Sequence, residues 1–286
     1  MAYTLIQQVK LEVADLDPSF PLLSDSDYEY PLLTHNNSVV RSAVDAESAI
    51  VAQQAGVDRI FYDLEYIGKA DRQHGRNTVL STNSIDDLPK IREVVNKSQL
   101  LVRTNPIHAY SQVEINKAIE YGADILMLPM TIDHHDAEDY VRMVNGRARV
   151  CIMIETASAM ARLDSILEVK GVDEIFIGLN DLHISMGLTF MFELLSGGLV
   201  EYIANKCNKV GIPFGFGGIA RIGEGDLPSD NILGEHVRLG STSVILLRYC
   251  VLCYSILCFY VLCCSVLCSS LLCFCFLCSS LLCCVS

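Results

Sequence analysis

The chain has 286 residues, a length that suits one large barrel domain or two small domains. Its 21 Lys and Arg against 34 Asp and Glu leave a formal net charge of −13, which repels nucleic acid and anionic lipid, so neither is an expected partner. Of the 13 cysteines, 11 follow residue 249, and the remaining two, Cys151 and Cys207, form no disulfide framework. With no secretory signal at the N-terminus, a cytoplasmic location is expected.

Short apolar runs alternate with amphipathic helical stretches from residue 31 to residue 247, whereas the polar residues 1–30 are expected to form an irregular arm. Eight strands are predicted, at 31–34, 59–64, 99–103, 125–128, 149–154, 174–177, 213–217 and 244–247. Helices are predicted at 86–95, 112–121, 137–145, 157–167 and 190–209. This order favours an α/β fold, in which residues 31–248 form a (β/α)₈ TIM barrel. A doubly wound open sheet is the alternative, but no G-x-G-x-x-G sequence follows the first strand.

Residues 249–286 form a Leu/Cys/Ser-rich tail in which the pair Leu-Cys recurs every five residues from Leu252. A period of five matches neither the helical nor the strand period, so it creates no stable apolar face. We interpret the tail as a translated tandem DNA repeat or a frameshifted end. A membrane-inserting segment is the main alternative, and only in that case is membrane association expected. The tail also leaves homo-oligomer formation in doubt.

Two carboxylates follow neighbouring predicted strands, Glu155 after strand five and Asp181 after strand six. In a barrel both lie at the mouth where active sites are built. Oxygen ligands of this kind suit Mg²⁺ or Mn²⁺. Equally, either carboxylate could cap the helix that follows it.

Five motifs around these positions resemble those of the HpcH/HpaI aldolase and citrate lyase β-subunit superfamily. They are 122–130, with the sequence GADILMLPM, and 154–156, 178–182, 63–65 and 102–103. The resemblance covers nearly all of residues 58–247 and implies a TIM barrel that acts on small 2-oxo acids.

The resemblance also implies roles for individual residues. Glu155 and Asp181 would ligate the divalent metal, Mg²⁺ or Mn²⁺. Arg103 would face the keto oxygen of a bound 2-oxo acid, and Asp63 and Glu65 would lie beside the metal's waters. Breaking the bond β to a ketone leaves an enolate, whose charge a metal ion and an arginine can stabilise. For Arg103 a structural salt bridge is the alternative.

The strand-six motif is implied to bind the substrate through Gly178, Leu179, Asn180 and Asp181. Backbone N–H groups around 179–181 would receive the substrate carboxylate at the start of a helix. The family has a glycine–proline pair at this position, so the Gly-Leu pair of this chain is a mild departure.

Tyr66 is a larger departure, because the family's metal-dependent aldolases have a histidine there that takes part in proton transfer. A tyrosine is a poor base near neutrality. Either a metal-bound water, His74 or His108 does this work, or the chemistry differs from aldol cleavage. Since no lysine lies at the end of a predicted strand, a Schiff-base mechanism is disfavoured.

The predicted function is therefore that of a divalent-metal-dependent carbon–carbon lyase of the aldolase type. It would act on a small 2-oxo acid, such as pyruvate or oxaloacetate, through a metal-stabilised enolate. The alternative is a catalytically impaired or non-catalytic metal-binding barrel, a degraded gene product that the tail could anchor in a membrane.

Other suggestive residues favour structural interpretations. The glycine-rich run 214–223 suits either a phosphate site or a tight loop. The run 133–136, Asp-His-His-Asp, looks like a metal cluster but favours a helix start with Asp133 as N-cap. Cys151 is expected to fill apolar space, and His183 and His236 suggest no chemistry.

Overall fold

The computed structural model describes residues 38–43, 45–54, 56–69, 83–219, 227 and 229–246. The predicted arm 1–30, the predicted strand 31–34 and the tail 249–286 lie outside the described residues.

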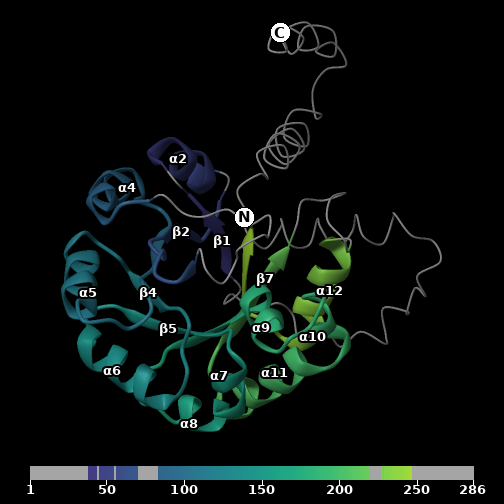
Figure 1. The fold of residues 1–286 in the computed structure, drawn as a ribbon. Coiled ribbons are helices and arrows are strands. Elements are labelled where there is room, and N and C mark those ends of the chain that lie inside the picture. The colour runs from purple at the N-terminus through teal and green to yellow at the C-terminus, as the bar shows by residue number, and fades with distance from the viewer. Residues whose placement is uncertain are drawn as a thin grey trace, which may run out of the picture. The chain divides into compact units, whose positions relative to one another are not determined.

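Eight parallel strands follow one another in chain order and close into a barrel, because the first strand pairs with the last (Figure 1). The strands are β1 (Ser38–Ser42), β2 (Arg59–Asp63), β3 (Gln99–Arg103), β4 (Ile125–Leu128), β5 (Arg149–Ile154), β6 (Glu174–Gly178), β7 (Phe214–Ile219) and β8 (Ser243–Leu246). The TIM-barrel prediction is thereby confirmed.

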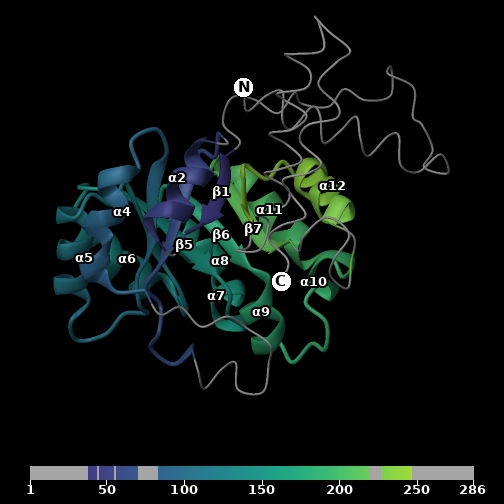
Figure 2. The ribbon, with the colours of Figure 1, turned by 90° about the horizontal axis from the view of Figure 1, so that it is seen from above.

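Helices surround the barrel and run between successive strands, as the two perpendicular views show (Figures 1 and 2). They are α2 (Ala46–Gln54), the 3₁₀ helix η1 (Ile85–Asp87), α4 (Leu88–Val94), α5 (Ser111–Glu120), α6 (His134–Val144), α7 (Ala157–Ala161), α8 (Leu163–Leu167), α9 (Leu179–Ser185), α10 (Glu193–Ser196), α11 (Leu199–Val210) and α12 (Ser229–Leu239). In the part of the chain that is described, no helix has the length and apolar character needed to cross a bilayer.

The structure corrects the first predicted strand. The strand that pairs with β2 and β8 is β1. It begins seven residues after the start of the predicted strand 31–34. Its sequence, Ser-Val-Val-Arg-Ser, has only two apolar residues, so the hydrophobic pattern is weak there.

Two predicted helices are also divided. The predicted helix 190–209 is α10 and α11, separated at Gly197 and Gly198, and Gly198 has a φ of 75° that a continuous helix excludes. The predicted helix 157–167 is α7 and α8, which meet at Arg162, whose φ is −111° and ψ 18°.

The barrel interior is filled by apolar side chains that alternate along the strands. These are Val40, Phe61, Leu101, Ile125, Met127, Cys151, Met153, Phe176 and Ile245. Cys151 is thus part of the barrel core, in agreement with its predicted role as a filler. Burial raises the pKa of its thiol well above the ordinary value, so this cysteine is not a nucleophile.

A buried ion pair closes the end of the barrel where the strands begin. Arg59 Nη1 lies 3.0 and 2.8 Å from the two carboxylate oxygens of Glu174, the first residues of β2 and β6. Arg149, at the start of β5, approaches the same carboxylate at 3.9 Å. This ion pair stabilises the face of the barrel formed by the N-terminal ends of the strands. In barrels of this class the functional side chains lie on the opposite face, at the C-terminal strand ends.

Candidate active site

An arginine whose side chain is 13% exposed forms the centre of the site at the C-terminal end of β3. Arg103 donates from Nε to Asp63 Oδ1 at 2.9 Å and from Nη2 to Asp63 Oδ2 at 2.8 Å, a two-bond clamp. Its Nη2 also lies 3.3 Å from Glu65 Oε2, and its guanidinium lies over the Phe61 ring at 5.4 Å. The remaining nitrogen, Nη1, contacts the Met153 sulfur at 3.8 Å, a weak acceptor.

Lys69 joins this group from the turn that follows β2. Its Nζ lies 2.9 Å from Asp63 Oδ2 and 3.4 Å from Glu65 Oε2, and its side chain is only 6% exposed. Lys69 was not predicted from the sequence because it lies away from the end of any predicted strand. The available signal was its spacing of four residues from Glu65. Its Nζ is held by the carboxylates of Asp63 and Glu65, so the geometry gives Lys69 the role of an ion-pair partner.

The two cations determine the charge state of Asp63. Burial by itself raises the pKa of Asp63, but the charges and hydrogen bonds of Arg103 and Lys69 outweigh burial and hold that pKa well below its ordinary range. Burial opposes the charge of Arg103, yet Asp63 and Glu65 raise its pKa above the ordinary value. Asp63 is therefore a permanent anion that orients the guanidinium.

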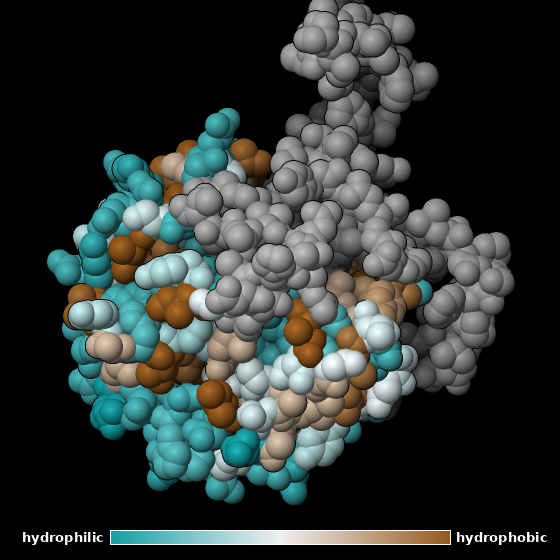
Figure 3. All heavy atoms as spheres, in the orientation of Figure 1, coloured by the Kyte–Doolittle hydropathy of each residue, from teal (hydrophilic) through white to brown (hydrophobic). Residues whose placement is uncertain are grey.

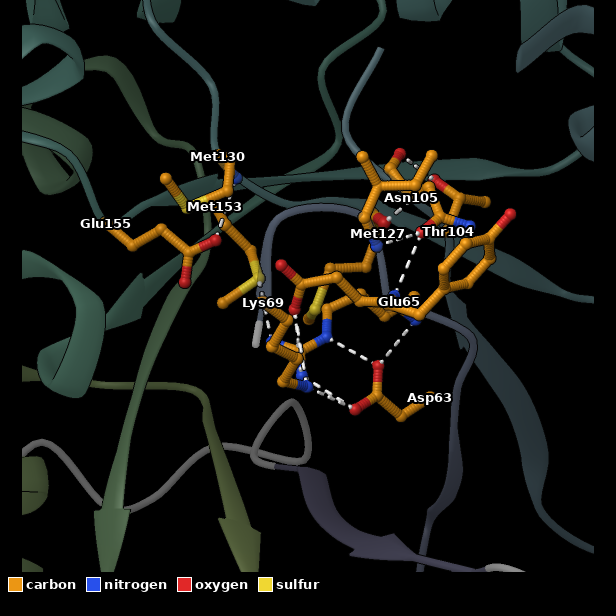
Figure 4. Close-up of polar contacts among 12 residues, drawn as sticks. Asp63, Glu65, Lys69, Thr104, Asn105, Met127, Met130, Met153 and Glu155 are labelled. Carbon is orange, nitrogen blue, oxygen red and sulfur yellow. Dashed lines mark hydrogen bonds and ion pairs between the residues drawn. The ribbon is translucent and has the colours of Figure 1, made fainter. Parts of the chain in front are cut away.

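The loop that carries Glu65 and Lys69 is itself anchored by Asn105. Its Oδ1 accepts the backbone N–H groups of Tyr66 and Ile67 at 3.0 Å each, and its amide donates to Glu114 at 2.8 Å. The loop after β2 is thus attached to the loop after β3 (Figure 4).

Glu155 lies apart from this cluster, next to Met130 and Met153 (Figure 4). It directly follows β5, is 1% exposed, and accepts the Met130 N–H at 2.8 Å. Met130 has a φ of 54°, a left-handed conformation uncommon for a residue with a side chain. A Cβ on Gly178 would lie 2.5 Å from Glu155 Oε2, so only glycine fits where β6 ends beside this carboxylate.

Asp181 belongs to the first turn of α9 and is 8% exposed. It is close enough to Glu155 for its charge to act there. Burial raises the pKa of Glu155 to about 8, and Glu65 and Asp181 contribute to the rise, whereas Arg103 and the Met130 N–H act in the opposite direction.

The helix-cap interpretation of these two carboxylates is wrong. Thr156, not Glu155, is the N-cap of α7, and its hydroxyl accepts from the Ala159 N–H. The N-cap of α9 is Gly178, so Asp181 lies inside that helix and does not cap it. Neither carboxylate is therefore explained by helix capping.

The charges at this face favour a divalent cation. Four buried acidic side chains face two cations here: Asp63, Glu65, Glu155 and Asp181 against Arg103 and Lys69. With all four ionised the excess is two negative charges, and the raised pKa of Glu155 opposes that state while no metal ion is bound. Buried carboxylate oxygens are the ligands that Mg²⁺ and Mn²⁺ prefer, and one such ion offsets the excess. Glu155 and Asp181 are the two carboxylates that the family resemblance gives as ligands, and the oxygens of these buried side chains suit such an ion.

Tyr66 and His108, the described side chains considered for proton transfer, do not converge on this site. Tyr66 is 67% exposed. In His108, Nδ1 accepts from the Tyr110 N–H at 3.2 Å and Nε2 lies 3.1 Å from Glu114, so both ring nitrogens are engaged in holding the loop. His74 lies outside the described residues.

The other suggestive motifs have structural explanations in the described part of the chain. A Cβ on Gly215 would lie 2.5 Å from the Ser243 carbonyl oxygen, so this glycine allows β7 and β8 to pair; residues 220–223 of the run are not described. His183 Nδ1 lies 3.2 Å from the Leu179 carbonyl oxygen. His236 is buried and stacks on Phe216 at 3.5 Å, and burial lowers its pKa to about 3.

The pKa of Glu155 predicts how the metal-free protein responds to pH. Folding raises this pKa from an ordinary 4.5 to about 8, so between these values the folded state binds more protons than the unfolded state. By linkage, the free energy of unfolding falls as pH rises through this window. Urea unfolding with a chelator present should show this fall, and Glu155→Gln should reduce it. Parallel pH profiles for the two proteins would contradict the assignment.

A closed (β/α)₈ barrel with a clamped arginine and buried carboxylates at the C-terminal strand ends has the architecture of a barrel enzyme. The chain belongs to the HpcH/HpaI aldolase/citrate lyase family, which it matches over residues 41–193. The match confirms the resemblance drawn from the motifs.

Individual relatives agree with this membership. A 4-hydroxy-2-oxo-heptane-1,7-dioate aldolase of Salmonella paratyphi A is 30% identical over 105 residues, a match that covers 26% of this chain and 40% of the relative. The HpcH/HpaI aldolase of Desulfitobacterium hafniense has a TM-score of 0.59 at 16% identity and covers 81% of this chain and 95% of its own. The citrate synthase SbnG has a TM-score of 0.60 at 18% identity, with coverage of 82% and 95%. These two structures show a shared fold.

Proposed function

We propose that the protein is a divalent-metal-dependent carbon–carbon lyase of the aldolase type that acts on a small 2-oxo acid. The observation that carries the proposal is the carboxylate excess at the barrel mouth beside a clamped arginine. Family membership supports it, and the aldolase relative suggests the reaction type.

Glu155 and Asp181 would hold the ion, which supplies a Lewis acid for the oxygens of the 2-oxo acid. Arg103 would donate from Nη1 to the keto oxygen, because its other nitrogens are occupied by Asp63 and Glu65. As the bond breaks, charge develops on that oxygen, and a fixed guanidinium stabilises it without reorganising. The first turn of α9, Leu179 to Asp181, would receive the substrate carboxylate.

Exchange of the pyruvate methyl protons with D₂O tests this function without knowledge of the second substrate. Enolate formation releases a methyl proton, so an active enzyme should deuterate pyruvate when Mg²⁺ is present and not when a chelator replaces it. Nuclear magnetic resonance measures the loss of the methyl signal. A non-catalytic metal-binding barrel, the alternative, predicts metal binding with no exchange.

Lys69 should act as a positioning residue in this reaction. Lys69→Met removes one hydrogen bond from Asp63 and leaves the two hydrogen bonds from Arg103 in place. Because a hydrogen bond to a charged group contributes about 1.5 kcal/mol, we expect about a tenfold loss in kcat for exchange. The KM for pyruvate and the Mn²⁺ affinity should change little, and Lys69→Arg should restore part of the rate. Unchanged kcat in Lys69→Met would show that the lysine serves only the fold.

A further inference from the structure

The start of α6 carries two histidines and a glutamate that the proposed reaction does not use. As predicted, Asp133 is the N-cap, and its Oδ1 accepts the His135 N–H at 2.9 Å. Helical spacing then places Glu138 one turn beyond His134 and His135. One ligand atom from each of these three side chains lies within 4.8 Å of the others, and His135 Nδ1 lies 3.5 Å from Glu138 Oε2.

The histidine pair has a feature that a helix cap does not explain. The two imidazole rings lie 4.0 Å apart, centroid to centroid, at 37°. His134 Nδ1 is buried and has no hydrogen-bond partner among the described residues. Buried polar atoms without a partner are rare in proteins because they lose free energy on leaving water, so this nitrogen calls for a ligand or another function.

We propose that His134, His135 and Glu138 bind a divalent transition-metal ion of the Zn²⁺ type. Two imidazoles and one carboxylate are a zinc ligand set, with water completing the tetrahedron. Bonds of 2.0–2.1 Å in a tetrahedron bring ligand atoms to about 3.3 Å from one another. The side chains of His135 and Glu138 are 72% and 55% exposed, so they can turn to close the present spacing.

The surrounding charge favours a cation. The positive end of the α6 dipole would oppose one, but Asp133 and Asp136 lie at this helix end and offset it. In Figure 3 the surface over α5 and α6 is mainly hydrophilic. Among the described residues, Glu138 pairs with His135, and no lysine or arginine forms an ion pair with this carboxylate.

This site differs from the barrel mouth in its ligand chemistry. Glu155 and Asp181 offer only oxygen, which suits Mg²⁺ or Mn²⁺, whereas imidazole nitrogen selects zinc and its neighbours in the transition series. The two sites should therefore be loaded by different ions.

The test uses histidine modification by diethyl pyrocarbonate on the full chain, read residue by residue by peptide mass spectrometry. A peptide-level measurement is needed because cysteine thiolates are zinc ligands and 11 cysteines follow residue 249. Zn²⁺ should protect His134 and His135, and Mg²⁺ should not. Glu138→Gln should raise the zinc concentration for half protection about tenfold. Even the loss of a residue that only supports the metal ligands lowers metal affinity by about this factor.

Asp139→Asn is the matched control, since it removes the next acidic residue of α6, whose partner is Arg142. This variant should keep the protection curve of the unmodified protein. Glu155→Gln should keep it as well, which separates this site from the proposed catalytic metal. Equal protection in Glu138→Gln and the unmodified protein, or equal effects of Zn²⁺ and Mg²⁺, would overturn the proposal.

Discussion

Glu155→Gln should abolish metal-dependent proton exchange on pyruvate while the fold remains intact. The proposed ion contributes several kcal/mol to the transition state, so its loss should lower kcat by about a thousandfold or more. The fold should survive because the glutamine carbonyl oxygen can still accept the Met130 N–H, the hydrogen bond that Glu155 makes now. The substitution also replaces a group whose ionisation is disfavoured by burial, Glu65 and Asp181 with one that stays neutral.

Two measurements on this variant separate a metal site from a folding defect. Mn²⁺ binding, followed by electron paramagnetic resonance, should weaken strongly, and Asp181→Asn should have the same effect. The free energy of unfolding without metal should be equal to or above that of the unmodified protein. Glu120→Gln, an exposed carboxylate on α5, is the control and should change neither. Unchanged Mn²⁺ affinity in Glu155→Gln would show that the ion binds elsewhere.

Arg103→Lys should lower kcat for exchange about a hundredfold, the effect of removing roughly 3 kcal/mol of charge stabilisation at the oxyanion. The reason lies in the geometry of the clamp. Arg103 binds both oxygens of Asp63 through Nε and Nη2 and still has Nη1 for the substrate. A lysine has a single ammonium, which can pair with Asp63 or face the substrate but cannot do both in this arrangement.

The comparison with a second arginine makes this prediction specific. Arg142→Lys, on the exposed surface of α6, keeps the charge and should leave kcat unchanged. Circular dichroism and the free energy of unfolding report whether Arg103→Lys still folds. If the folded lysine variant exchanges protons as fast as the unmodified protein, Arg103 is a structural salt bridge, the alternative that its sequence position left open.

The pattern of the sequence predicted the buried strands well. The bounds of β3, β4 and β5 agree with the prediction at both ends. Parallel strands covered on both faces are continuous apolar runs, so their limits are visible in the residues themselves. The pattern failed at β1, whose apolar run is short, and in the helical stretch that Gly197 and Gly198 divide, where amphipathic spacing continued across the break.

The sequence by itself determined the barrel class and the face on which Asp63, Arg103, Glu155 and Asp181 lie, because parallel strands bring their carboxyl ends to one edge. Only the tertiary structure decided which charges meet. Arg103 and Asp63 are 40 residues apart, and their clamp depends on the register of β2 against β3. Lys69 reaches this pair by the course of a loop, for which strand and helix periodicity carry no information. The raised pKa of Glu155 likewise depends on burial and on the charges of Glu65, in the loop after β2, and Asp181, in α9, which come together only once the barrel has closed.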